Sequence, residues 1–193
     1  MKIWSLENYR IIRIIQGHTK AVLQAKFNTD SSLILSCSKD TNINLWNIEG
    51  LELKTLKGHT KDVCNIFFSF DEDNIVSASK DKTIKVWDLE NETEIKTIKS
   101  HNKDINSILI TDDNQNILCC GNDKYISIIP LRSHEEKKEV LHDNTIKNKE
   151  DDLKEVLKIE NFRTIKNNTN IESLCYSNDG RNIAAALDDK TIK

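Results

Sequence analysis

The chain has 193 residues, of which 37% are hydrophobic, enough to bury the core of a single domain. Its formal net charge of −3 at pH 7 excludes an overall positive field for nucleic acid or an anionic membrane. The N-terminus shows no charged-then-apolar signal pattern, and no apolar run approaches the ~20 residues that cross a membrane. We therefore expect an intracellular protein, cytoplasmic or nuclear, without membrane contact.

Apolar segments separated by turn residues divide the first 99 residues into a half-unit and two whole units. The half-unit is 1–16, with predicted strands over 1–6 and 9–15, because residues 2–6 superimpose on residues 85–89. The whole units are 17–57, with strands near 22–27, 33–37, 43–46 and 51–56, and 58–99, with strands near 63–68, 75–78, 83–87 and 94–98. Apolar residues on both faces of the inner strands are typical of a sheet packed between two others.

The third unit, residues 100–130, is degenerate. Ser100 stands where the earlier units have glycine, and Ile129 stands where they have tryptophan. Pro130 follows at once and suits the end of a strand better than the middle of a sheet. We expect this unit to be less stable than the two before it.

Beyond residue 130 the pattern stops and later resumes. Residues 131–170 are rich in charged side chains and are predicted to form a flexible insertion. Within that insertion, residues 155–166 fit either a displaced fourth strand or a short helix, and periodicity does not decide between them. Residues 171–193 begin a further unit, since residues 189–193 match residues 81–85.

Three residue types recur at a constant interval of 41 or 42 residues along the chain, and within each unit His precedes Asp by 22 residues. Self-similarity at this period predicts a repeat architecture. The recurring residues are His18, His59 and His101; Asp40, Asp81 and Asp123; and Trp4, Trp46 and Trp87.

The unit that opens with Gly58-His59 and closes with Trp87-Asp88 resembles the WD repeat, a resemblance that covers residues 1–130. It implies an all-β propeller in which each repeat supplies four antiparallel strands of one blade. The chain would hold about four blades, counted as three whole repeats plus half-blades at both termini. Either residues 1–16 complete the blade begun at 171–193, or the chain is an excerpt of a larger propeller; we favour the excerpt, because the ends lack capping features.

The whole units also combine Ser, His and Asp, the residue types of a catalytic triad. A nucleophile needs one activated copy beside a substrate pocket, whereas this set recurs with the period of the fold. The resemblance implies instead a buried hydrogen-bonded network in each blade. Its expected members are His18, Ser36, Asp40 and Trp46; His59, Ser77, Asp81 and Trp87; and His101 and Asp123. Cys119 replaces the serine in the third unit, and Asn167 and Ala185 replace histidine and serine in the fourth.

Neither an enzyme nor a cofactor or metal site is predicted. The sequence has no glycine-rich phosphate loop, nucleophile elbow or metal-ligand spacing. Its five cysteines contain no C-x-x-C pair and indicate reduced, buried thiols.

The resemblance places partner binding on the rim, at positions three and five residues after the His and one before the Asp. The expected protein-binding residues are Ala21, Leu23 and Lys39; Asp62, Cys64 and Lys80; Asp104, Asn106 and Asn122; and, in the fourth unit, Asn170, Glu172 and Asp188. This set lacks the aromatic and arginine side chains that dominate binding energy. A local basic patch is a further expectation, formed by Lys39, Lys80 and Lys82 with Lys20 and Lys61.

These observations predict a non-catalytic scaffold that binds other proteins or peptides in an intracellular complex. The alternative is a subunit of an RNA-processing particle, because the junction from residue 2 to residue 19 is similar to those of WD-repeat subunits in the nucleolar small-subunit processome. RNA contact would then be weak or indirect. A homo-oligomer is expected if the chain is complete.

Overall fold

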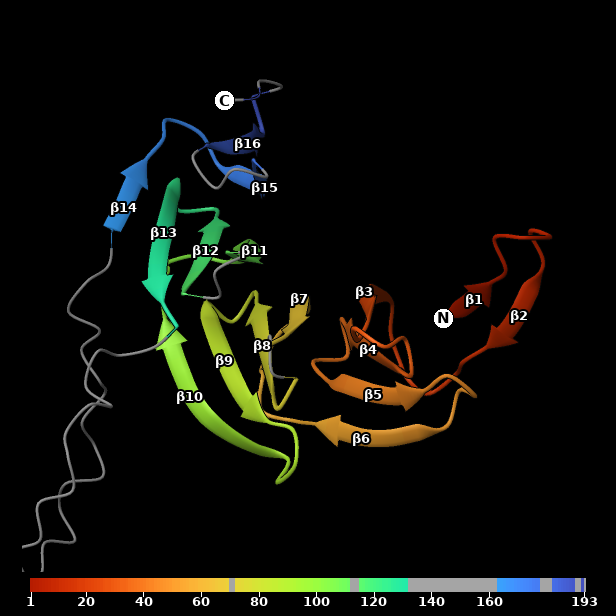
Figure 1. The fold of residues 1–193 in the computed structure, drawn as a ribbon. Helices are drawn as coiled ribbons and strands as arrows, with labels where there is room; N and C mark the ends of the chain where they lie inside the picture. Colours follow the sequence, from red (N-terminus) through yellow and green to blue (C-terminus); the bar gives the residue numbers. More distant parts are fainter. Residues whose placement is uncertain (70–71, 112–114, 132–162, 178–181, 190–191, 193) are drawn as a thin grey trace, which may run out of the picture.

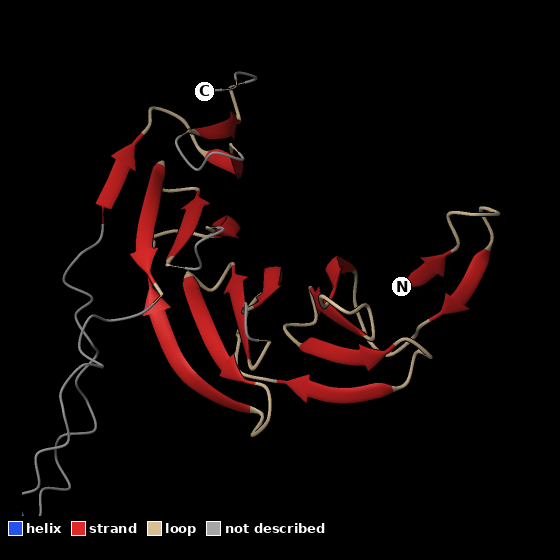
Figure 2. Ribbon diagram, viewed as in Figure 1, coloured by secondary structure: helices blue, strands red, loops and turns tan. Residues whose placement is uncertain are grey.

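The computed structural model shows an open arc of twisted β-sheets (Figure 1). It describes residues 1–69, 72–111, 115–131, 163–177, 182–189 and 192. Every element in these ranges is a strand (Figure 2). Accordingly, no helix capable of crossing a membrane occurs in the part of the chain that the structure describes.

Within the described residues, sixteen strands form three complete four-stranded sheets and two two-stranded sheets, all antiparallel. The N-terminal sheet contains β1 (Lys2–Trp4) and β2 (Ile11–Ile14). The first complete sheet contains β3 (Val22–Phe27), β4 (Leu33–Ser38), β5 (Ile43–Asn47) and β6 (Glu52–Leu56). The second contains β7 (Val63–Phe68), β8 (Asn74–Ser79), β9 (Thr83–Asp88) and β10 (Thr93–Lys99). The third contains β11 (Ile105–Ile110), β12 (Asn116–Gly121), β13 (Tyr125–Pro130) and β14 (Arg163–Lys166), and the C-terminal sheet contains β15 (Ile171–Tyr176) and β16 (Ile183–Leu187).

Strand order within each complete sheet follows the chain, as in β3-β4-β5-β6. The first strands, β3, β7 and β11, lie on the inside of the arc and the fourth strands lie on the outside (Figure 1). In β4, β8 and β12, five of six residues are buried, because each has a strand on either side and a sheet against each face. This explains the apolar character of both faces in the sequence.

The hydrophobic core lies between consecutive sheets. Trp87 on β9 lies in one buried cluster with Leu45 and Leu56 of the sheet before it. Trp46 on β5 lies in a buried cluster with Ile34 of its own sheet and with Ile15, against which Met1 and Ile3 of the N-terminal segment pack. Burying each such side chain contributes about 1.5–3 kcal/mol, so every sheet depends on its neighbours for most of its stability.

The fourth strand of the third sheet follows the charged segment. β14 pairs with β13, with Ile165 opposite Ile126. The expected insertion, 131–170, is therefore too long at its C-terminal end, and of the two alternatives for residues 155–166 the structure shows a strand over 163–166. Without β14, the edge of β13 would present unpaired backbone groups. The predicted flexibility concerns residues 132–162, which lie outside the described residues.

Candidate interaction face and the network beneath it

Each of the first two complete sheets contains one chain of hydrogen bonds that joins four side chains. In the second sheet, Trp87 Nε1 lies 2.8 Å from Ser77 Oγ, Ser77 Oγ lies 2.8 Å from His59 Nε2, and His59 Nδ1 lies 2.7 Å from Asp81 Oδ2. The first sheet repeats the arrangement at 2.8, 2.8 and 2.9 Å. The residues there are Trp46, Ser36, His18 and Asp40.

The indole N–H determines which atom donates in each hydrogen bond of this series. The N–H of Trp87 can only donate, so the oxygen of Ser77 accepts it. The hydroxyl proton of Ser77 is then available for Nε2 of His59, which leaves the imidazole proton on Nδ1, facing Asp81. A neutral imidazole therefore satisfies every bond, and the chain needs no buried positive charge.

The carboxylates that end these chains remain ionised over most of the pH range. Burial alone would raise the pKa of Asp81, but hydrogen bonds from His59, Thr83 and the Thr60 backbone outweigh it and hold the pKa well below its usual value. For Asp40, burial likewise raises the pKa, and bonds from the backbone amides of residues 42 and 19 and from His18 lower it further than burial raises it. Each carboxylate therefore binds the loop before the first strand to the turn between the second and third strands.

Geometrically these chains resemble a Ser-His-Asp triad, and burial distinguishes them from one. Ser36 and Ser77 are 0% exposed and lie behind tryptophan rings that are 2% exposed. Each hydroxyl oxygen already accepts a bond from an indole, so it cannot approach a substrate carbonyl. The arrangement connects loops to the sheet and leaves no space for a reacting group.

The third sheet forms a shorter version of the chain. His101 Nδ1 lies 2.7 Å from Asp123 Oδ1, and His101 Nε2 lies 3.1 Å from Cys119 Sγ. Ile129, fully buried, occupies the place of the tryptophan. In the C-terminal sheet Thr169 Oγ1 lies 3.3 Å from Asp189 Oδ2.

Ser100 and Ile129 replace a glycine and a tryptophan that lie close together in the earlier sheets. A Cβ atom at Gly17 would overlap the ring of Trp46, and one at Gly58 would lie 3.0 Å from the ring of Trp87. The indole therefore leaves no room for a side chain at Gly17 and little room for one at Gly58. In the third sheet isoleucine (Ile129) replaces the tryptophan and serine (Ser100) replaces the glycine.

The predicted rim residues of each unit lie together at one end of the sheets. Backbone amides of the turns between second and third strands donate to carbonyls of the preceding loops, at 2.9 Å for Lys39 to Ala21, 3.0 Å for Lys80 to Asp62 and 3.0 Å for Asn122 to Asp104. We call this surface, on the three complete sheets, the His–Asp face; it comprises residues 16–23, 39–42, 57–64, 80–83, 99–106 and 122–125. The loops that join first to second and third to fourth strands form the opposite face.

The rim residues differ in how available they are. Ala21, Leu23 and Lys39 of the first sheet are exposed. In the second sheet Lys80 Nζ lies 3.5 Å from Asp62, and Cys64 Sγ lies 3.3 and 3.2 Å from two backbone carbonyl oxygens.

In the third sheet the rim residues contact the protein itself. Asn106 donates to Asn122 at 2.7 Å, and Asp104 lies 3.7 Å from Lys61. In the fourth unit Glu172 and Asp188 are exposed and Asn170 is half-buried. The exposed rim side chains therefore lie on the first complete sheet and on the C-terminal sheet.

The position five residues after the His is a β-bulge in every repeat. The register skips one residue between Val22 and Gln24 on β3, which leaves Leu23 unpaired. The same skip leaves Cys64, Asn106 and Glu172 unpaired on β7, β11 and β15. A bulge turns a side chain out of the regular alternation and places it near the rim.

Sequence reasoning missed the side chains that join one inner strand to the next. Gln24 Oε1 accepts a hydrogen bond from the backbone amide of Ile66 at 2.7 Å. Asn65 Oδ1 accepts one from the amide of Ile108 at 3.2 Å. Both residues stand six positions after a repeat histidine, so an amide side chain at that spacing was the available signal.

The two faces differ in charge. Nine lysines lie on the His–Asp face, against five acidic residues of which three end the buried hydrogen-bond chains. The lysines are Lys20, Lys39, Lys57, Lys61, Lys80, Lys82, Lys99, Lys103 and Lys124. Acidic side chains gather on the opposite face, among them Glu7, Asp30, Glu49, Glu72, Asp73, Glu90 and Glu92.

Repeated four-stranded antiparallel sheets around an arc, each with a His-Asp pair beneath one face, define blades of a β-propeller. The family described as WD domain, G-beta repeat matches residues 9–47, 50–88, 92–129 and 160–193, which is more than half of the chain. The chain belongs to this family, and family members of this kind act as protein-interaction scaffolds. Each matched range begins with the outer strand of one sheet and continues into the next, so sequence repeat and blade are offset by one strand.

Among curated proteins, the chain is similar to nuclear distribution protein PAC1 of Tuber melanosporum (strain Mel28), with 43% identity over 49 residues. That stretch covers 24% of the chain and 11% of the relative. The chain thus matches only a small part of the relative's length.

Proposed function

We propose that the chain is a non-catalytic scaffold whose His–Asp face binds other proteins within an intracellular complex. The observation that carries this proposal is the combination of a rigid base and free side chains above it. Buried hydrogen-bond chains fix the loops in position, while Ala21, Leu23 and Lys39 remain exposed. Side chains held on a rigid scaffold lose little entropy on binding, which favours recognition.

The rim residues named above are the proposed contact positions, with the first sheet as the main contributor. A location in the cytoplasm or nucleus is part of the proposal and is supported by the similarity to a nuclear distribution protein. Homo-oligomerisation stays a prediction, and light scattering of the purified chain measures it directly.

Affinity capture with matched charge reversals tests the proposal. A double variant on the His–Asp face, Lys39→Glu with Lys103→Glu, changes two exposed lysines outside the buried chains. Its control, Glu7→Lys with Glu90→Lys, makes the same number of reversals on the opposite face. Quantitative mass spectrometry of proteins captured from the source cells should show at least fivefold loss for the first variant and unchanged recovery for the control. Equal recovery with both variants would contradict the proposal.

The second candidate is a subunit of an RNA-processing particle, for which the nine lysines of the His–Asp face are the supporting observation. Binding of single-stranded RNA should then weaken steeply between 50 and 200 mM salt. An affinity that does not change with salt, or no RNA binding at all, would remove this candidate.

A further inference from the structure

The His–Asp face carries positive charge that its own acids leave uncompensated. Its five aspartates are already engaged, since three accept hydrogen bonds from the repeat histidines and two pair with lysines. Asp62 lies 3.5 Å from Lys80, and Asp104 lies 3.7 Å from Lys61. Within the described residues, the other lysines of this face have no ion-pair partner. Their charge is available to a partner from outside.

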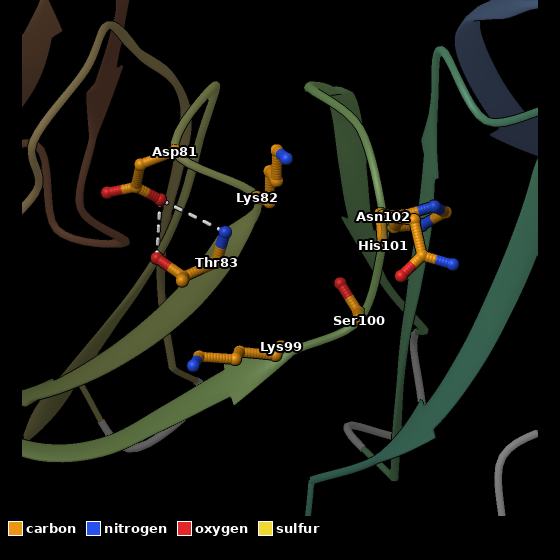
Figure 3. Close-up of a pocket in the computed structure, with 7 residues that line it drawn as sticks. All are labelled: Asp81, Lys82, Thr83, Lys99, Ser100, His101 and Asn102. Carbon is orange, nitrogen blue, oxygen red and sulfur yellow. Dashed lines mark hydrogen bonds between the residues drawn. The ribbon is translucent and has the colours of Figure 1, made fainter.

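Five of these unpaired lysines recur at equivalent loop positions in the three complete sheets. Two stand two residues after a repeat histidine, one stands directly before a repeat aspartate, and two stand directly after one. All five are exposed, and we call them the loop lysines: Lys20, Lys39, Lys82, Lys103 and Lys124. Lys99, and Lys57 at the equivalent sequence position, are not counted among them, because Figure 3 shows the Lys99 side chain directed away from the loop of residues 100–102.

The turn after β8 shows how aspartate and lysine are separated. The carboxylate of Asp81 accepts hydrogen bonds from His59 at 2.7 Å and from the amide of Thr83 at 3.0 Å. Figure 3 shows this carboxylate turned toward Thr83, while the side chain of Lys82 borders the space between the turn and the loop of residues 100–102. In each complete sheet the repeat aspartate is likewise bound by a histidine. The acids therefore bind within the loops, and the loop lysines remain at the surface.

The loop lysines belong to three different sheets and are spread over the face. Consecutive packed sheets lie about 10 Å apart, so the first and third complete sheets are separated by about 20 Å near the inside of the arc. An extended chain of about six or seven residues covers this distance. At physiological ionic strength charges are screened over about 8 Å, and one exposed ion pair strengthens binding only about two- to fivefold. A ligand with a single acid would therefore bind weakly, whereas an extended segment with several acids would engage several lysines at once.

The residue types of the face favour polypeptide carboxylates over nucleic acid. None of the described residues of the His–Asp face is an arginine, and half-buried Tyr125 is the one aromatic residue among them apart from the histidines. Surfaces that bind nucleic acid use aromatic side chains to stack bases and arginines to bind phosphate through two parallel hydrogen bonds. Lysine is a flexible point charge, which responds to charge density rather than to a planar group. The face therefore suits a flexible chain that carries several carboxylates.

We propose that the loop lysines bind an acidic segment of a partner protein, an extended stretch rich in aspartate and glutamate that crosses from the first to the third complete sheet. The affinity arises from the sum of several exposed ion pairs, so no single pocket is required. Charge complementarity of this kind also speeds association and disfavours basic partners. The inference rests on the proposed function as a protein-binding scaffold and names the chemistry of the partner.

Fluorescence anisotropy of a labelled probe peptide tests the proposal with the full chain. The probe is a blocked peptide of about 14 residues with alternating glutamate and serine, and its control carries glutamine in place of glutamate. At about 50 mM salt we expect saturable binding of the glutamate peptide and no binding of the glutamine peptide. The affinity for the glutamate peptide should fall at least about tenfold at about 200 mM salt, because both partners are exposed and their attraction is screened.

A double variant, Lys20→Gln with Lys82→Asn, removes one loop lysine from the first complete sheet and one from the second. Asparagine is used at position 82 because it tolerates the φ of 76° found there. The affinity for the glutamate peptide should fall at least about fourfold, since two ion pairs are lost. The matched control, Lys2→Gln with Arg10→Gln, removes two exposed positive charges outside the His–Asp face and should change the affinity less than about twofold. Urea midpoints equal to that of the unchanged chain confirm that both variants fold.

Several results would overturn the proposal. These are no binding of the glutamate peptide, equal binding of the glutamine peptide, an affinity that does not change with salt, or an equal loss with the control variant. Tighter binding of an oligouridylate with the same number of charges would also overturn it, in favour of a nucleic-acid surface. Failure of this inference is separable from failure of the proposed function, because a partner that binds the face through a neutral segment would still be lost in the affinity capture with Lys39→Glu and Lys103→Glu.

Discussion

Replacing Trp87 by alanine should cost about 3–5 kcal/mol of unfolding free energy. Its ring is 2% exposed and packs against Leu45 and Leu56 of the preceding sheet. Removing a buried aromatic ring costs this amount through lost transfer energy and the cavity left behind. Loss of the hydrogen bond from the Trp87 N–H to Ser77 adds about 0.5–1.5 kcal/mol to the loss of unfolding free energy. The Ser77 oxygen then has no donor, but its hydroxyl still bonds to His59.

Two further variants separate packing from hydrogen bonding. Trp87→Phe keeps most of the packing and loses the N–H, so about 1–2 kcal/mol is expected. Trp4→Ala removes the same residue type from the equivalent place on β1, where the ring is 53% exposed, and should cost under about 2 kcal/mol. Urea unfolding followed by far-ultraviolet circular dichroism measures all three, with an unchanged slope as the check on comparability. Equal costs for Trp4→Ala and Trp87→Ala would refute the assignment of Trp87 to the inter-sheet core.

The remaining predictions concern a close contact, acid stability and thiol reactivity. Gly17→Ala should lower stability by about 1–3 kcal/mol, since the added methyl group overlaps the ring of Trp46; urea midpoints measure the loss, and a neutral result would contradict the packing. Hydrogen bonds hold the pKa values of Asp40 and Asp81 below the value near 4 of an unfolded aspartate. The stability that the two carboxylates contribute is therefore fully present above about pH 4 and is lost as pH falls, so the urea midpoint at pH 3 should lie below the urea midpoint at pH 7. Cys175 is exposed, whereas burial raises the thiol pKa of the other four cysteines to about 12, so a disulfide reagent should label one thiol in the native chain and all five after unfolding.

The period of the sequence was sufficient to place most strands. Apolar segments lie between turns that contain glycine, asparagine or aspartate, and this pattern repeats every 41 or 42 residues. The strands of the first two complete sheets occur within one or two residues of their expected positions. In these two sheets the local sequence predicts the observed strands, because each strand is an apolar segment with turn residues at both ends.

Other features depend on contacts between distant residues, which a repeat pattern does not contain. β14 joins its sheet across 32 intervening residues, and nothing in residues 163–166 alone specifies β13 as its partner. The bond from Gln24 to the amide of Ile66 links two repeats, and the close approach of Gly17 to the ring of Trp46 joins residues 29 positions apart. These features arise from packing between sheets, where register and volume are set by the neighbour.

Hydrogen–deuterium exchange of the chain with a captured partner measures whether the His–Asp face is the binding surface. We expect slower amide exchange in residues 16–21, 39–42, 57–62, 80–83 and 99–104 when the partner is bound. Residues 28–32, 48–51 and 89–92, on the opposite face, should exchange as they do in the free chain. Protection confined to those opposite loops, with unchanged exchange on the His–Asp face, would contradict the account.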